Sequence, residues 1–180
     1  MLHTLTNIYL HKNFVALYTD LSNSSQFIFG RIANINKDEI AIYAISPEGY
    51  FDGVVAKKTT DILRVDLGGR YMNKMKQLMA IHHVEIPDYE LDNKDIFRSL
   101  LTLAKDSREI VSLELLESGY VDVTGFVINL ENDVCAIKQV DPFGNEDGIS
   151  FINKNDISQI SYSSSDEVTL YELWEANGYG

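Results

Sequence analysis

The amino-acid sequence predicts a mainly β protein with short helices, built from two copies of one five-stranded domain. The first observation is a repeat, because residues 14–79 and 109–174 align without a gap at an offset of 95. The second is that both copies contain short β-branched or aromatic segments, separated by turn residues at matching positions. The third is that apolar residues at helical spacing stand before and after each set of segments.

The repeat is carried by turn residues more than by overall identity. About 13 of the 66 aligned positions are identical, and apolar positions elsewhere exchange mostly for apolar ones. Turn residues determine the backbone path and apolar positions determine the core, so this pattern indicates one fold with a diverged surface. The identical pairs at predicted turns and kinks are Gly30 and Gly125, Pro47 and Pro142, Gly49 and Gly144, Asp52 and Asp147, and Gly53 and Gly148.

Five strands are predicted in each copy. Short strands in a meander would leave open edges unless the sheet bends strongly and closes, so we expect two small β-barrels. In the first copy the strands are 14–20, 26–36, 39–46, 52–58 and 61–66, and in the second they are 110–116, 120–129, 134–140, 148–153 and 156–162.

The repeated turn between the third and fourth strands has a structural interpretation. Pro47 presets φ for a turn, Gly49 accepts a positive φ, and Asp52-Gly53 provides a second bend or bulge. Gly30, inside an apolar strand, suits a kink or a close backbone approach. The alternative is that this loop binds a ligand in both copies.

Helices are predicted at both ends of each copy. Leu5 and Ile8 indicate a short helix before the first set of strands, and residues 95–104 indicate one before the second. After the strands, residues 70–79 read as a helix with Tyr71, Met75 and Leu78 facing inward, and a capping box from Ser164 to Glu167 begins the corresponding helix. The predicted domains are 1–80 and 92–180, joined by a linker at 81–91.

Charge is distributed unevenly along the chain. The net charge is −12, and the residues from Glu109 onward contain 14 Asp and Glu against only Lys138 and Lys154. An acidic half repels phosphate backbones, so only the first half could engage nucleic acid. The first residues do not have the pattern of a signal peptide, no apolar run is long enough to span a membrane, and the single cysteine fits a reducing compartment. We therefore expect a cytoplasmic protein that does not bind membranes.

The order of elements resembles a known family. A short helix precedes five bent strands, and a glycine in the second strand leads to an asparagine, as in GRIAN (30–34) and GFVIN (125–129). This pattern resembles the Sm-like small β-barrel, a relative of SH3-type barrels. The resemblance implies RNA binding through a basic and aromatic pocket and a glycine-containing motif at strands four and five. LRVDLGGR (63–70) is loosely similar to that motif, whereas SQISYSSS (158–165) is not.

Motifs for catalysis or metal binding are weak. Asp141, Asn145, Glu146 and Asp147 could suggest a calcium loop, but they lack the ligand spacing of a calcium-binding hand. The four histidines are not spaced for a shared metal, and Cys135 lies in phase with core positions. The sequence therefore predicts no cofactor, no metal site and no enzyme activity. A catalytic site assembled from distant residues would leave no such motif, so the enzyme alternative stays open.

Two functions of different class remain. The first is a non-catalytic interaction or regulatory module that binds a protein partner or associates with itself. The second is nucleic-acid binding through the more basic first copy. In either case the predicted partner-binding residues are Lys57, Lys58, Arg64, Arg70, Lys74 and Lys76, and their alternative interpretation is an ordinary solvated face.

Overall fold

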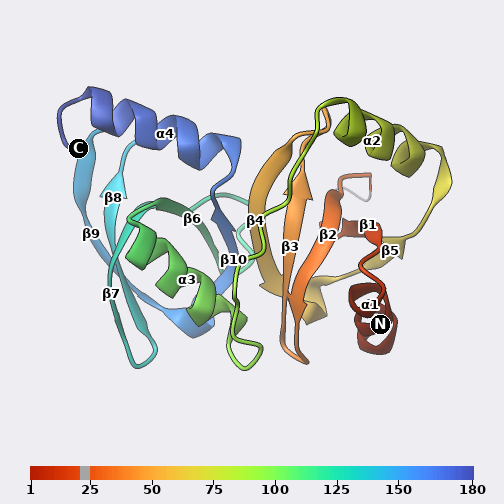
Figure 1. Ribbon diagram of the computed structural model, residues 1–180. Coiled ribbons are helices and arrows are strands. Elements are labelled where there is room, and N and C mark those ends of the chain that lie inside the picture. Colours follow the sequence, from red (N-terminus) through yellow and green to blue (C-terminus); the bar gives the residue numbers. More distant parts are fainter. Residues whose placement is uncertain (21–24) are drawn as a thin grey trace. The chain divides into compact units, whose positions relative to one another are not determined.

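The computed structural model describes residues 1–20 and 25–180, and it divides into two compact units, Met1–Ile96 and Phe97–Gly180 (Figure 1). The described residues form ten strands, four α-helices and two short 3-10 helices. The strand pairs described in each unit are antiparallel. The predicted mainly β class with short helices is therefore confirmed.

Unit 1 is an antiparallel sheet in the order β5-β1-β2-β3-β4, preceded by one helix and followed by another. Strands β1 to β4 form a simple meander, because each of these strands pairs with the next along the chain. Its elements are α1 (Leu2–Leu10), β1 (Phe14–Tyr18), β2 (Ile28–Ile35), β3 (Glu39–Ile45), β4 (Phe51–Lys58), η1 (Thr59–Asp61), β5 (Arg64–Asp66) and α2 (Gly69–Ile81).

The sheet of unit 1 is buried on both faces. On one face Leu5 and Ile8 of α1 pack against strand residues such as Ile42. On the other face the methionines of α2 pack against a second set that includes Phe29 and Ile45. Of the residues predicted to face inward from α2, Met75 is fully buried and Leu78 is partly buried against the same cluster, whereas Tyr71 is exposed. The buried residues of this helix are Met72, Met75 and Met79.

Unit 2 has the same strand order, β10-β6-β7-β8-β9, when the strands are matched in chain order. The capping box predicted for its last helix is present, since Ser164 and Glu167 bond reciprocally. Its elements are α3 (Ile96–Ser107, which starts at the last residue of unit 1), β6 (Ile110–Leu115), β7 (Val123–Glu131), β8 (Val134–Val140), β9 (Glu146–Asn153), η2 (Lys154–Asp156), β10 (Ile157–Tyr162) and α4 (Ser165–Ala176).

The duplication extends to the details of strand pairing. Gly30 pairs with Ala44, and Gly125 pairs with Gln139, at an offset of 95 in both strands. The register shifts also recur, between Ile32 and Asn34 in unit 1 and at the matching positions of unit 2. The same small fold is thus present twice.

The ungapped alignment is wrong in the first strand. Val15 pairs with Gly30, but the residue that pairs with Gly125 is Val111 and not Ile110. The first helix and first strand of the two units therefore match at an offset of 96, because unit 1 has one more residue between its first two strands. The alignment of the two copies did not reveal this one-residue gap, because the loop between the first two strands has no turn residues that match in both copies.

Closed barrels are not shown by the strand pairing. In each unit the hydrogen-bonded order is a line whose end strands, β5 and β4 or β10 and β9, are not neighbours in the order. The described pairings therefore establish five antiparallel strands in the same open order within each unit.

The turn glycines between β3 and β4, and between β8 and β9, lie against the following helix. Gly49 has φ 89° and Gly144 has φ 80°, and each follows the turn proline, Pro47 or Pro142. A Cβ atom on Gly49 would lie 2.5 Å from Cβ of Leu78, and one on Gly144 would lie 2.8 Å from Cβ of Leu173. The turn thus needs glycine for its backbone conformation and for the close approach of the helix.

The other repeated turn residues have separate roles. Gly53 and Gly148 have φ 78° and 81°, and each follows an aspartate, Asp52 or Asp147, in the fourth strand of its unit. Gly30 and Gly125 lie where a Cβ atom would meet the backbone carbonyl of the neighbouring strand, that of Tyr43 or Lys138. Gly30, Gly53, Gly125 and Gly148 lie within strands of the hairpins.

Candidate interaction surface

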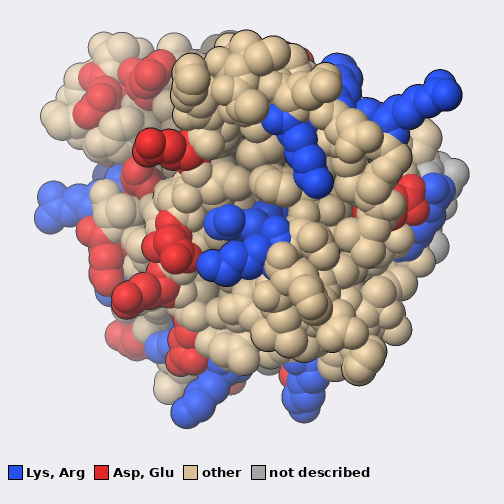
Figure 2. All heavy atoms as spheres, turned by 45° about the vertical axis from the view of Figure 1, so that its right-hand side comes forward, with Lys and Arg blue, Asp and Glu red and all other residues tan. Residues whose placement is uncertain are grey.

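The six predicted partner-binding cations lie on three elements of unit 1. Lys57 and Lys58 are adjacent in β4, so their side chains point to opposite faces of the sheet. On α2, Arg70 and Lys74 are four residues apart and share one side of the helix, whereas Lys76 points away from them. The sixth, Arg64, is on β5. Figure 2 accordingly shows Lys and Arg in separate groups with uncharged surface between them.

Arg64 is held by its own neighbours. Its Nε and NH2 atoms donate to the two carboxylate oxygens of Asp66, at 2.8 and 2.5 Å, and its guanidinium lies 4.5 Å from the ring centroid of Tyr18. The Arg64 hydrogen bond holds the pKa of Asp66 below its usual value. These contacts neutralise the charge locally, so Arg64 is a poor candidate for binding a phosphate.

Residues 84–95, called here the 84–95 segment, lie against one face of the unit 1 sheet after α2 (Figure 1). Val84 and Ile86 pack on the same cluster as the α2 methionines. Further along, the Tyr89 N–H donates to Tyr43 Oη at 2.9 Å, and the two rings are 6.2 Å apart. Burial raises the pKa of Tyr43, as expected for a covered phenol.

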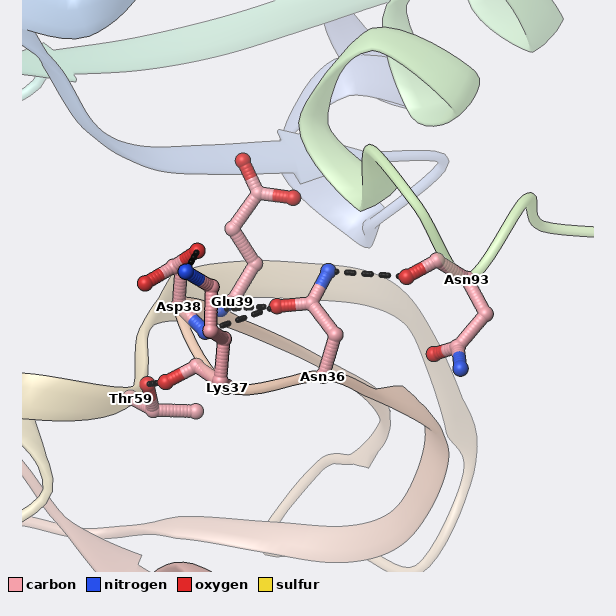
Figure 3. A network of polar contacts seen from close by, with 6 residues as sticks. All are labelled: Asn36, Lys37, Asp38, Glu39, Thr59 and Asn93. Carbon is pink, nitrogen blue, oxygen red and sulfur yellow. Dashed lines mark hydrogen bonds and ion pairs between the residues drawn. The ribbon is translucent and has the colours of Figure 1, made fainter.

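Two asparagines fasten the rest of this segment. Asn34 Nδ2 donates to the carbonyl of Leu91 at 2.7 Å, and Asn36 Nδ2 donates to the carbonyl of Asn93 at 3.0 Å. Figure 3 shows Asn36 between Asn93 and the β2–β3 turn, where its Oδ1 accepts the N–H groups of Asp38 and Glu39. Residues 84–92, which form neither helix nor strand, and the turn at 93–94 are thus held on β3, β2 and the β2–β3 turn by backbone hydrogen bonds as well as by apolar packing.

The matching face of unit 2 is exposed. We call it the β8–β9 face and define it by Asn129, Val134, Lys138, Ile149 and Phe151. These residues share one side of the sheet, because Lys138 is opposite Ile149 and the residue opposite Phe151 is Ala136, in phase with Val134 and Lys138.

Its apolar members have exposed fractions of 45% for Val134, 53% for Ile149 and 76% for Phe151. In unit 1 the positions that match Ile149 and Phe151 are Val54 and Ala56, and both are fully buried.

The charges around the β8–β9 face are mostly negative. Lys138 Nζ forms an ion pair with Glu146 Oε1 at 2.5 Å, so its charge is compensated within the face. Asn129 Nδ2, whose counterpart in unit 1 holds Leu91, bonds Glu131 Oε1 at 3.0 Å. An apolar row bordered by carboxylates suits a partner that has apolar and basic side chains.

A cavity of about 380 Å³ also lies in unit 2, between the end of α3 and α4. Its lining includes Arg108, Tyr171 and four glutamates, but Glu167 is already used to cap α4 through the Ser164 N–H. Among the described residues no group of three or more His, Cys, Asp or Glu side chains could hold a metal ion.

Cys135 lies in the core of unit 2. Its side chain is fully buried, and this burial raises the pKa of its thiol to about 11. A thiol with that pKa stays protonated near neutral pH and is a weak nucleophile. The residue thus serves packing, at the position that matches buried Ile40 in unit 1.

Sequence reasoning missed the β8–β9 face. The sequence predicts a strand over 148–153 but does not identify which of its side chains are exposed. A signal was present in the comparison of the two copies, because Phe151 replaces Ala56 at a matched position. Such a gain in side-chain volume is difficult to accommodate in an unchanged core.

No helix among the described residues is long and apolar enough to cross a membrane. Comparison of the chain with known proteins found no match to a family model, to a curated protein or to a solved structure.

Proposed function

We propose that the protein is a non-catalytic interaction module, in which two small, bent, Sm-like β domains support a surface that binds another protein. The observation that carries the proposal is the exposure of Ile149 and Phe151 at positions where unit 1 buries Val54 and Ala56. At these positions unit 2 has larger apolar side chains than unit 1, and it exposes them to solvent. Such exposure is unfavourable unless another molecule covers the surface.

The geometry of the surface supports a protein partner. Aromatic and aliphatic side chains in a row, with polar groups around them, are the composition of protein interfaces. The six basic residues of unit 1 support nucleic-acid binding less well, because they lie on three elements and Arg64 is paired with Asp66. Phosphate contacts gain affinity when several cations face one backbone.

The test is affinity purification of the tagged full-length protein from its own cells, with and without nuclease, followed by reconstitution with the purified partner. We expect a protein partner that stays bound after nuclease treatment. The proposal is contradicted if recovery depends on nucleic acid.

A direct titration complements this test. Single-stranded RNA and duplex DNA are added to the full chain at about 20 mM salt, where phosphate contacts are strongest. We expect no saturable binding at micromolar concentration. Tight binding that is lost on changing Lys57, Lys58 and Arg64 to Glu would instead establish the nucleic-acid function.

A further inference from the structure

We infer that the β8–β9 face of unit 2 binds an extended, apolar and basic segment of the partner protein, laid across the strands as the 84–95 segment is laid across unit 1. This inference rests on the proposed function and names the site and the chemistry of the partner. It is derived from the duplication, because unit 1 holds its own segment at Asn34 and Tyr43, and the matching part of unit 2 is exposed.

Unit 1 provides the template for the binding mode. From one end of the face to the other, Tyr89 is held by Tyr43, Leu91 by Asn34, and the Ile96 N–H by Glu39 Oε2 at 2.7 Å. Two of these contacts join a side chain of β2 or β3 to a backbone group of the segment, and the third joins Glu39 to the first residue of α3. Recognition of this kind combines hydrogen bonds to the backbone of the bound chain with packing of its side chains, as Val84 and Ile86 pack in unit 1.

Of the three anchor side chains of unit 1, unit 2 keeps the asparagine, whereas Lys138 replaces Tyr43 and cannot accept a hydrogen bond. Asn129 matches Asn34 and has the same orientation, since its Oδ1 accepts the Leu130 N–H at 2.9 Å and Asn34 Oδ1 accepts the Ile35 N–H at 2.8 Å. The Nδ2 of Asn129 is therefore placed to donate to a peptide carbonyl, in exchange for its present bond to Glu131. Val134 stands at the position of Glu39, so at this end of the face an apolar side chain replaces the carboxylate that accepts the Ile96 N–H in unit 1.

The rest of the face indicates what the bound segment contributes. Ile149 and Phe151 stand where unit 1 has the smaller Val54 and Ala56, so unit 2 offers more apolar surface to a bound chain. A segment with apolar side chains at alternate positions would cover both residues, because alternate side chains of an extended chain share one side.

The charge of the 84–95 segment makes it an unsuitable ligand for the β8–β9 face of a second copy. The 84–95 segment has five acidic residues and one lysine, and the residues of unit 2 from Glu109 onward are strongly acidic as well. A second copy would therefore bring like charges together, whereas a segment with Lys or Arg would be attracted. The occupant that fits is a basic segment of a different protein.

Two fluorescent peptides test the inference by anisotropy with the full-length protein. One has the sequence of residues 84–95, and the other has Glu85, Asp88, Glu90 and Asp92 replaced by Lys. We expect the cationic peptide to bind with a Kd below about 100 μM and the acidic one at least about tenfold more weakly.

Phe151→Ala and Phe143→Ala form a matched pair of variants. Both residues are phenylalanines of unit 2, with exposed fractions of 76% and 75%, so neither change should disturb folding. Phe143 lies in the β8–β9 turn, outside the face. We expect Phe151→Ala to raise the Kd of the cationic peptide at least about tenfold, and Phe143→Ala to change this Kd by less than about twofold. Ile149→Ala is a second variant of the face, and we expect it to raise the Kd of the cationic peptide as Phe151→Ala does.

The inference is overturned if the cationic peptide does not bind at about 1 mM, or if it binds equally to all variants, since binding then reflects net charge alone. It is also overturned if the acidic peptide binds as well as the cationic one. These outcomes are distinct from failure of the proposed function, because the affinity purification can still recover a protein partner whose binding does not respond to Phe151→Ala.

Discussion

The side-chain amide of Asn34 donates a hydrogen bond of 2.7 Å to the backbone carbonyl of Leu91, 57 residues later in the chain. This contact fastens an extended segment to the sheet that precedes it. Asn129, at the same place in the second copy of the fold, donates instead to the Glu131 carboxylate. Asn34 thus lies on a face that holds a segment of the chain, whereas Asn129 lies on an exposed face.

The first prediction compares these asparagines. Asn34→Ala should lower the free energy of unfolding by about 1–3 kcal/mol, because it leaves the Leu91 carbonyl without this donor in a partly buried site. Asn129→Ala is the control and should cost less than about 0.5 kcal/mol, since Asn129 is exposed. Urea unfolding followed by circular dichroism measures both. Equal losses would mean that the contact with Leu91 contributes nothing.

A second prediction concerns the turn glycines. Gly49→Ala should destabilise the protein by at least about 2 kcal/mol, because the new Cβ would combine a positive φ with a clash against Leu78. Gly148→Ala should cost about 1 kcal/mol, since its φ of 81° is unfavourable for alanine but nothing lies within 4 Å of the added atom. Denaturant midpoints of the two variants are compared. If Gly148→Ala is the more damaging change, the close approach of α2 to the turn has no energetic importance.

The thiol of Cys135 should be unreactive in the folded protein. Its pKa of about 11 and its complete burial keep it protonated and out of reach of solvent reagents at pH 8. We expect modification by a disulfide reagent to proceed only as fast as the protein unfolds, and to become rapid in denaturant. Fast labelling of the native protein, at the rate of a free thiol, would contradict the buried position.

The last prediction is a pH dependence of stability from Asp141. The backbone N–H of Asn145 donates to its carboxylate at 2.8 Å and holds its pKa below the ordinary value, and the Phe143 N–H adds a second bond. A carboxyl whose folded pKa is depressed stabilises the protein above its unfolded pKa, and this stabilisation is lost as the pH falls through the folded value.

The measurement compares wild type with Asp141→Asn. The stability difference between them should be largest near pH 6 and should shrink as the pH approaches 3. Urea unfolding across this range tests it, and a difference that stays constant with pH would show that the charge of Asp141 has no part in holding the turn.

Several features were predictable from the sequence because their signals are local. Pro47-Glu-Gly49 and its repeat specify the turns, and the capping box of Ser164 and Glu167 specifies the start of α4. Such signals act through residues that are neighbours in the chain, so the order of strands and helices and the duplication follow from them.

Other features were decided by the tertiary structure. The one-residue gap that matches Val15 to Val111 depends on which residues pair across strands, and the sequence does not contain that register. The burial of Ala56 and the exposure of Phe151 depend on what covers each strand, which neither residue's own sequence neighbours determine. A residue's own type and spacing show whether it can be buried, but only contacts between distant parts of the chain determine whether it is, and the β8–β9 face arises from such contacts.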